Sequence, residues 1–384
     1  MNNKKKKLIF LTGGGTGGSV IPLLAVTTEL SGVDFLWLGT QAGLEKQIVE
    51  KEGIKFQAII NGKWRRYFSL KNFIDIFKII GSFFQSVWLI LIKKPDLIMS
   101  VGSFVSVPVV WAGWLLGVKI LVHQQDARPG LANKLMAPFA DIVTVTFEKS
   151  LDDYKKAVWT GNPTKIMNYP SRQPRRVQTG HRRADEDELP VSPASLSPGG
   201  SSASRGGGIQ NGGKNVLPSA LIVGGGTGAQ AINDLVYKGL NELTKFCQII
   251  HITGKGKNKN IKADNYCSYD FLDAKQIMEV LRKSNVVVSR CGMGLLTELS
   301  YLGKPAILIP MPNSHQEDNA KIFADKNAAI ILNQKDLTPE KFIKEIKKIL
   351  DDEVLRSMLR NNIKGVIKTD ANKRIEKIIN KLLS

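Results

Sequence analysis

Two glycine clusters are the residues of this chain whose type and spacing most directly suggest a chemical role. The first reads FLTGGGTGGSVIP at 10–22, and the second reads LIVGGGTGAQAIN at 221–233. Each follows a short apolar run and precedes a helix-like segment, so first-turn N–H groups and the positive end of a helix dipole would face a bound anion. Two such loops predict two phosphate-bearing ligands that meet in a cleft between domains.

Neither cluster fits the common nucleotide fingerprints. No Gly-Lys-Ser/Thr follows either loop, which argues against a P-loop. The dinucleotide pattern G-x-G-x-x-G can be laid over 13–18, but the ribose-binding acid expected about 20 residues later is met only loosely by Asp34. A nicotinamide would also leave the second loop unexplained. We therefore expect no cofactor.

Short apolar runs predict the strands that position these loops. They alternate with helix-like segments, as is typical of a parallel sheet with crossover helices, and the pattern restarts after residue 216. We therefore predict an α/β fold with two doubly wound, Rossmann-like halves, which a length of 384 residues accommodates. In the first half the runs lie at 8–12, 35–39, 96–102, 119–124 and 141–147.

Charge and cysteine content limit the partners and the compartment. The net charge of +20 is spread over both halves, unlike the single basic stripe of many nucleic-acid binders. We expect no nucleic acid, and anionic small molecules or an anionic membrane surface fit better. The three cysteines lack C-x-x-C spacing, so neither a disulfide framework nor a zinc site is indicated, which fits a reducing cytoplasm. The apolar run at 8–11 is too short for a signal peptide.

The segment 168–216 differs from the rest of the chain. It contains SPASLSPGGSSASRGGG and almost no apolar residues, so it cannot bury enough surface to order itself. We predict a disordered insertion near the domain junction. Its Asp185-Glu186-Asp187 formally matches the D-x-D of metal-dependent glycosyltransferases, but within such a charged run we interpret the match as chance and expect no metal.

The segment 70–92, LKNFIDIFKIIGSFFQSVWLILI, predicts a helix with one narrow polar stripe. Charged residues interrupt it well short of the roughly 20 apolar residues that span a bilayer. Two interpretations stay open: a buried helix, or a helix packed on one side and touching lipid on the other, helped by Lys93 and Lys94. The stripe consists of Lys71, Asp75, Lys78, Ser82 and Gln85.

Eight motifs in order resemble the MurG family of N-acetylglucosamine transferases. Together they cover nearly all of the chain outside 168–216, which makes the resemblance far more specific than one glycine loop. They are GGGTGGSVIP (13–22), GSFVSVP (102–108), HQQDARPGLANK (123–134), TGNPTK (160–165), GGGTGAQAIN (224–233), HITGKG (251–256), SRCGMGLLTEL (289–299) and HQEDNA (315–320).

The resemblance implies a GT-B fold, in which two Rossmann-like domains face a cleft. It implies an inverting, metal-independent transfer of N-acetylglucosamine (GlcNAc) from UDP-GlcNAc to undecaprenyl-diphosphate-linked muramyl-pentapeptide (lipid I), at the cytoplasmic face of the membrane. The domains expected are an acceptor domain at 1–163, a junction with the insertion at 164–216, a UDP-sugar domain at 217–365, and a C-terminal helix at 366–384 that packs back on the first domain.

The resemblance also implies roles for individual residues. On the donor side, Glu298 would accept hydrogen bonds from the ribose hydroxyls, Gln316 and Asn319 would read the transferred sugar, and Leu272 would lie near the uracil. On the acceptor side, the first glycine loop would hold the lipid diphosphate. The remaining positions implied are Thr16, Gly17 and Gly18 for the acceptor, Gly226 and Thr227 for the UDP phosphates, Met293, Gly294, Leu295, Leu296 and Thr297 around the nucleotide, and Asp126 and Lys165.

Departures from the family pattern fall on catalytic positions. Ser19 stands where the family usually has His, and His123-Gln124-Gln125-Asp126 stands where it usually has H-E-Q-N. Because a serine hydroxyl is no base at neutral pH, we predict that Asp126 takes the proton of the acceptor hydroxyl, and that His123 orients the loop or shares the charge.

Further departures are Lys165 in place of Arg, which keeps the charge but loses bidentate geometry, and GGGTGA at 224–229 in place of GGSQGA, so that a serine hydroxyl at the phosphate loop is absent. These changes keep two alternatives open. One is a related UDP-sugar transferase with another lipid acceptor, and the other is a catalytically degenerate homologue that binds UDP-sugar or lipid.

Overall fold

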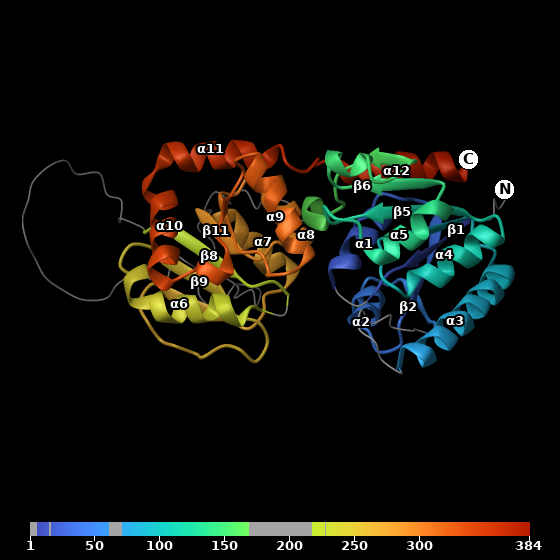
Figure 1. The fold of residues 1–384 in the computed structure, drawn as a ribbon, viewed down its shortest axis with the longest axis horizontal. Helices are drawn as coiled ribbons and strands as arrows, with labels where there is room; N and C mark the ends of the chain where they lie inside the picture. Colours follow the sequence, from blue (N-terminus) through green and yellow to red (C-terminus); the bar gives the residue numbers. More distant parts are fainter. Residues whose placement is uncertain (1–5, 15–16, 61–70, 169–216, 227) are drawn as a thin grey trace, which may run out of the picture.

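The computed structural model describes residues 6–14, 17–60, 71–168, 217–226 and 228–384 (Figure 1). Within these ranges the chain forms two parallel sheets covered by helices, which confirms the predicted α/β class with two Rossmann-like halves. The predicted insertion at 168–216 lies outside the described residues, apart from residue 168, and so do Thr16 and Thr227.

In the described part of the chain, the first sheet has seven parallel strands in the order β3-β2-β1-β4-β5-β6-β7. β4 is buried along its whole length, as expected for a parallel sheet with helices on both faces. The strands are β1 (Lys7–Thr12), β2 (Val33–Gly39), β3 (Lys55–Ala58), β4 (Leu97–Ser100), β5 (Lys119–Gln124), β6 (Ile142–Val145) and β7 (Ala157–Trp159).

Among the described residues up to 168, five α-helices and four short 3-10 helices accompany this sheet. The α-helices are α1 (Ile21–Thr27), α2 (Leu44–Lys51), α3 (Lys71–Lys93), α4 (Ser106–Leu115) and α5 (Leu131–Met136). The 3-10 helices are η1 (Gly17–Ser19), η2 (Ala137–Phe139), η3 (Glu148–Leu151) and η4 (Lys165–Asn168).

The second sheet, as far as the structure describes the chain, has six parallel strands in the order β10-β9-β8-β11-β12-β13. Its strands are β8 (Ser219–Val223), β9 (Gln248–Ile252), β10 (Tyr266–Tyr269), β11 (Val286–Ser289), β12 (Ala306–Leu308) and β13 (Ile330–Ile331). Its helices are α6 (Gln230–Leu243), α7 (Ala274–Lys283), α8 (Met293–Leu302), α9 (His315–Asp325), η5 (Gln334–Asp336), α10 (Pro339–Asp351) and α11 (Glu353–Lys364).

The last helix, α12 (Ala371–Leu383), packs on the N-terminal domain. Ile375 and Ile379 are fully buried there, in one cluster with Ile9 and Leu11 of β1. Figure 1 shows α12 in red over the first sheet, away from the strands of the second. The chain therefore crosses from the first domain to the second and back, while the residue limits predicted for the domains stay predictions.

The side chains of helix α3 show which way part of its polar stripe faces. Ser82 is only 1% exposed, and the side chain of Gln85 accepts from Ile60 N (2.8 Å) and donates to Ala58 O (3.4 Å). The polar stripe thus faces the protein at these two positions. The exposed side is apolar, with Phe84 65% and Trp88 60% exposed. Within the described ranges, no helix is long and apolar enough to cross a bilayer.

Candidate active site

The first glycine loop links β1 to α1 and is tightly packed where it leaves the strand. The carbonyl of Gly13 accepts from Trp37 Nε1 (3.2 Å), and a Cβ on Gly14 would collide with the buried carboxylate of Glu45. The hydroxyl of Ser19 donates to Gly14 O (3.1 Å), so it is used to shape the loop. Gly18, in η1, is exposed and keeps this loop open to a ligand.

The second glycine loop links β8 to α6 and also needs glycine for steric reasons. Gly228 has a φ of +72°, and a Cβ there would collide with Thr253 O. A Cβ on Gly224 would collide with Ala229 N. Gly226, in contrast, is exposed and has open space beside it, which suits an approaching phosphate.

The N-terminus of α8 is a further place where glycines adjoin open space. Gly292 caps the helix without a side-chain hydrogen bond, and Gly294 in the first turn is exposed. Burial raises the pKa of the Glu298 carboxyl, one turn further on, to about 7. Within the described part of the chain, this carboxylate has no hydrogen-bond or ion-pair partner. The desolvated carboxylate of Glu298 can accept from hydroxyls, and the first-turn N–H groups of α8 can donate to phosphates, so this helix end suits a ligand that carries both.

The other residues expected around the nucleotide are mainly structural in their contacts. Met293 and Leu296 are buried, Leu295 is half-buried, and the hydroxyl of Thr297 donates to Met293 O (2.6 Å). Leu272 is 6% exposed and belongs to the core of the C-terminal domain. The ammonium of Lys165 is paired with Glu52 (2.7 Å). Their roles toward a substrate stay predictions.

The helix α9 carries Gln316 and Asn319, the two residues predicted to contact the transferred sugar. Gln316 Oε1 accepts from Cys291 N (3.3 Å) and Met311 N (3.1 Å), while its Nε2 remains a possible donor. Asn319 is fully buried: Ala127 N donates to its Oδ1 (2.8 Å), and its Nδ2 donates to Cys291 O (3.1 Å). Asn319 therefore binds protein groups here, which departs from the expectation that it reads a sugar.

Asp126 lies at the junction of the two domains, opposite α9. Its Oδ1 accepts from Asn319 Nδ2 (3.0 Å) and lies 3.8 Å from His315 Nε2. A second ion pair joins Arg128 to Asp318 (3.1 Å) beside it. The Asp126 side chain is 33% exposed, so the carboxylate is positioned by the C-terminal domain yet accessible. Sequence reasoning missed His315, although it stands next to Gln316 in the motif HQEDNA.

His123 is fully buried and joins the domains through hydrogen bonds. Its Nδ1 lies 3.0 Å from Thr144 Oγ1, its Nε2 lies 3.0 Å from Asn162 Oδ1, and Asn162 Nδ2 donates to Thr297 Oγ1 (2.7 Å). Because the Oδ1 of Asn162 can only accept, the hydrogen bond to it places the imidazole proton on Nε2 of His123. Burial lowers the pKa of His123 to about 4, so the ring is neutral and shielded from solvent. A neutral, buried ring favours the alternative that His123 orients the loop, and its role toward Asp126 stays a prediction.

One polar atom next to Asp126 is left unpaired. Gln125 is 9% exposed, and its Nε2 has no hydrogen-bond partner in the described structure. Buried donors are nearly always paired in folded proteins, so an orphan beside the candidate base indicates a place for a ligand acceptor. Nothing in the spacing of the sequence singled out Gln125. Among the described residues, no group of three or more His, Cys, Asp or Glu side chains could hold a metal ion.

Comparison with family models covers both domains. The glycosyltransferase family 28 N-terminal domain matches residues 9–145, and the glycosyltransferase family 28 C-terminal domain matches residues 219–377. Together these two regions take in both sheets' glycine loops and the helices α8 and α9.

Known proteins of similar sequence extend over the full chain. A protein of Clostridium kluyveri named UDP-N-acetylglucosamine–N-acetylmuramyl-(pentapeptide) pyrophosphoryl-undecaprenol N-acetylglucosamine transferase is 33% identical, covering 98% of this chain and 99% of its own. A protein of the same name from Borreliella burgdorferi is also 33% identical, covering 98% and 96%. The crystal structure of Acinetobacter baumannii MurG matches with a TM-score of 0.71 at 22% identity, covering 98% and 99%. This likeness in structure confirms the predicted GT-B fold.

Proposed function

The chain belongs to glycosyltransferase family 28, and from this membership we propose that it transfers GlcNAc from UDP-GlcNAc to lipid I, giving lipid II for peptidoglycan synthesis. The observation that carries this conclusion is the full-length identity of 33% to transferases with that printed name. Roles in cell wall biogenesis, cell shape and cell division follow from that pathway. The eight motifs that resembled the MurG family predicted the same reaction.

On the donor side, we assign the diphosphate of UDP to Gly226 and the first turn of α8. Leaving-group charge would be met there by preorganised N–H groups and the helix dipole. Glu298 would accept from both ribose hydroxyls, and Gln316 Nε2 would donate to the sugar. The unpaired carboxylate of Glu298 supports this assignment.

On the acceptor side, the lipid diphosphate would lie at Gly17 and Gly18, with the muramyl sugar over Gln125 and Asp126. The sugar hydroxyl attacks the anomeric carbon of GlcNAc, a C–O bond forms as the bond to UDP breaks, and the configuration inverts. The hydroxyl proton goes to Asp126. Its accessible carboxylate, held by Asn319, supports this role, whereas the Ser19 hydroxyl is not basic and donates within its own loop.

We further propose that the protein docks peripherally on the cytoplasmic face of an anionic membrane through α3. Phe77, Phe84 and Trp88 form an exposed apolar stripe at helical spacing, and Trp114 on the adjacent α4 is 55% exposed. Lysines at the end of α3 would meet anionic headgroups. The expectation that the protein binds no nucleic acid stays a prediction.

A transfer assay tests the proposed function. UDP release from UDP-GlcNAc should require lipid I, yield lipid II and continue in EDTA, because helix N-termini replace a divalent cation at the leaving group. Transfer to another lipid, such as diacylglycerol, but not to lipid I would favour the alternative acceptor. Binding of UDP-GlcNAc without any transfer would instead support a degenerate homologue. Loss of turnover in EDTA that magnesium restores would contradict the metal-independent mechanism.

A further inference from the structure

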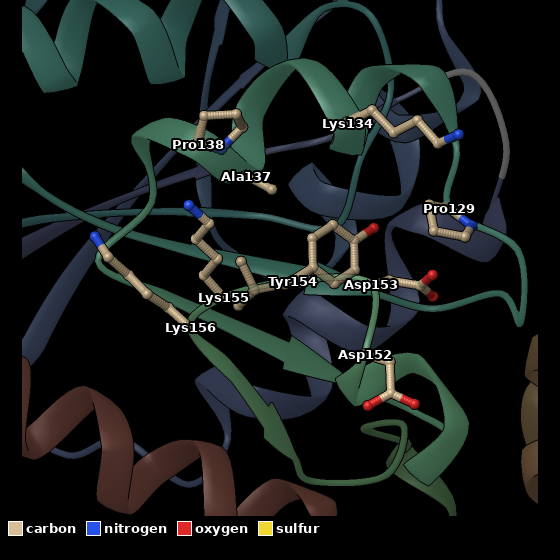
Figure 2. A pocket seen from close by; sticks show the side chains of 10 residues that line it. Pro129, Lys134, Ala137, Pro138, Asp152, Asp153, Tyr154, Lys155 and Lys156 are labelled. Carbon is tan, nitrogen blue, oxygen red and sulfur yellow. The ribbon is translucent and has the colours of Figure 1, made fainter.

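A groove of about 800 Å³ lies on the N-terminal domain, beside the loop that carries Asp126. One wall is formed by α5 and η2, and the other by the turn at 152–156 (Figure 2). Tyr154 lies in the middle, Pro129, Lys134 and Asp153 lie toward one end, and the amino group of Lys155 lies toward the other. The volume falls in the range of small-molecule sites. We call this feature the Tyr154 groove.

The Tyr154 groove is connected to the candidate base by one glutamine. The hydroxyl of Tyr154 donates to Gln124 Oε1 (3.1 Å), and Gln124 Nε2 donates to Asp126 O (2.7 Å) and Arg128 O (3.2 Å). Burial raises the pKa of the Tyr154 hydroxyl, which therefore stays a donor at neutral pH. Pro129, three residues after Asp126, lines the groove, so the groove lies beside the loop proposed to hold the acceptor sugar.

The charges of the Tyr154 groove are mixed at one end and positive at the other. Asp152, Asp153 and Lys134 lie toward the end with Pro129, while Lys155 lies toward the end with Pro138. The ammonium of Lys155 has no hydrogen-bond or ion-pair partner among the described residues. Single exposed charges bind weakly, so such a pattern selects a ligand that carries matching charges at the same separation. An extended peptide with free carboxylates and a side-chain ammonium has this chemistry.

We propose that the Tyr154 groove binds the pentapeptide of the acceptor. This inference rests on the proposed function, which places the muramyl sugar over Gln125 and Asp126. A peptide attached to that sugar would pass Pro129, pack on the ring of Tyr154, set its ammonium against Asp153 and its terminal carboxylate against Lys155. The groove then determines which acceptors are used, while the transfer chemistry stays at Asp126.

The test compares two acceptors with the full-length protein. One is lipid I with its complete pentapeptide, and the other is the same polyprenyl-diphosphate muramyl lipid with only the first amino acid. The parent protein should show a KM about tenfold lower for the complete acceptor. Lys155→Glu should raise that KM about tenfold and leave the KM values for the short acceptor and for UDP-GlcNAc within about twofold. Asp153→Asn should also raise the KM for the complete acceptor. It should not change the KM for the same acceptor once the peptide's ammonium has been acetylated.

Lys344→Glu is the matched control. Lys344 is exposed on α10, so this substitution makes the same charge change outside the groove. It should leave all three KM values unchanged. Equal KM values of the parent protein for the two acceptors would overturn the peptide site while leaving the proposed function intact. The peptide site would also be overturned if Lys155→Glu raised the KM for both acceptors equally, or changed neither KM. Failure of the parent protein to use either acceptor would instead contradict the proposed function.

Discussion

At the residue scale, the candidate site is built from side chains of both domains that hydrogen-bond to one another. Asn319 of α9 holds both the carboxylate of Asp126 and the N–H of Ala127. His123 is linked through Asn162 to Thr297 of α8. Because a removed partner would leave a buried polar group unsatisfied, these contacts fix where the candidate base Asp126 and the first turn of α8 lie.

Replacing Asp126 by Asn should lower kcat about a hundredfold, because an amide cannot take the proton of the attacking hydroxyl. The KM for UDP-GlcNAc should change little, since Asn at this position still accepts from Asn319. Adding Ser19→His should restore part of the rate by placing a base in the first glycine loop. Steady-state kinetics with lipid I measure these changes. Parent-like turnover of Asp126→Asn would show that the base lies elsewhere.

Donor affinity should depend on pH through Glu298. Its pKa is raised to about 7, so about a tenth of the protein carries the carboxylate at pH 6 and about nine tenths at pH 8. Since the charged form is the better acceptor for ribose hydroxyls, binding of UDP-GlcNAc should strengthen up to about tenfold over that range. Calorimetric titration would measure it. Glu298→Gln should bind more weakly and without this pH dependence, and a variant that kept the dependence would assign it to another group.

At the element scale, α3 directs two residues of its polar stripe, Ser82 and Gln85, toward the protein. Gln85 satisfies backbone groups at the end of β3, Leu89 and Ile90 are buried, and the opposite face is apolar and exposed. An exposed apolar stripe on a surface helix indicates an interaction surface.

Replacing Phe84 and Trp88 by Ser should weaken sedimentation with anionic vesicles at least about tenfold, since each ring loses apolar burial worth about 1.5–3 kcal/mol at full depth. The KM for UDP-GlcNAc and the melting temperature should stay unchanged, because both side chains are mostly exposed. Val354→Ser removes a side chain 81% exposed on α11 and serves as the control. Unchanged vesicle binding of the double variant would refute docking through α3.

At the scale of the whole molecule, the domains are joined twice. The chain passes through Thr164 on the way to the C-terminal domain, and α12 returns to the first sheet. Asn372 of α12 accepts from Thr164 N (3.0 Å) and donates to Thr164 O (3.1 Å), so both crossings are tied together. The aromatic ring of Trp159 is covered by the ammonium of Lys368 at 3.5 Å, beside the same junction.

The variant Ile375→Ala should destabilise the N-terminal domain by about 2–5 kcal/mol, because this fully buried side chain would leave a cavity against β1. Urea unfolding followed by tryptophan fluorescence would measure the change. Lys381→Ala, on an exposed position of the same helix, should change stability by less than about 0.5 kcal/mol. If Ile375→Ala lost no more than this control, α12 would not contribute to the stability of the first domain.

The sequence by itself determined the fold class, the two glycine loops and the family. Apolar runs such as 96–102 and steric demands such as that of Gly224, where a Cβ would collide with Ala229 N of the same loop, are properties of short stretches, so they can be recognised without knowing distant neighbours. The order of the motifs along the chain then predicted the reaction.

Tertiary structure alone decided how the site's side chains are used. Asp126 and Asn319 are 193 positions apart, and their hydrogen bond forms only because the carboxyl ends of two separate sheets meet. Burial, which neutralises His123 and leaves Gln125 unpaired, depends on the surrounding elements, and so does the direction that α3 gives its polar stripe. Spacing reveals which residues can share a face, but the packing of distant elements sets which face is covered and which reaches a ligand.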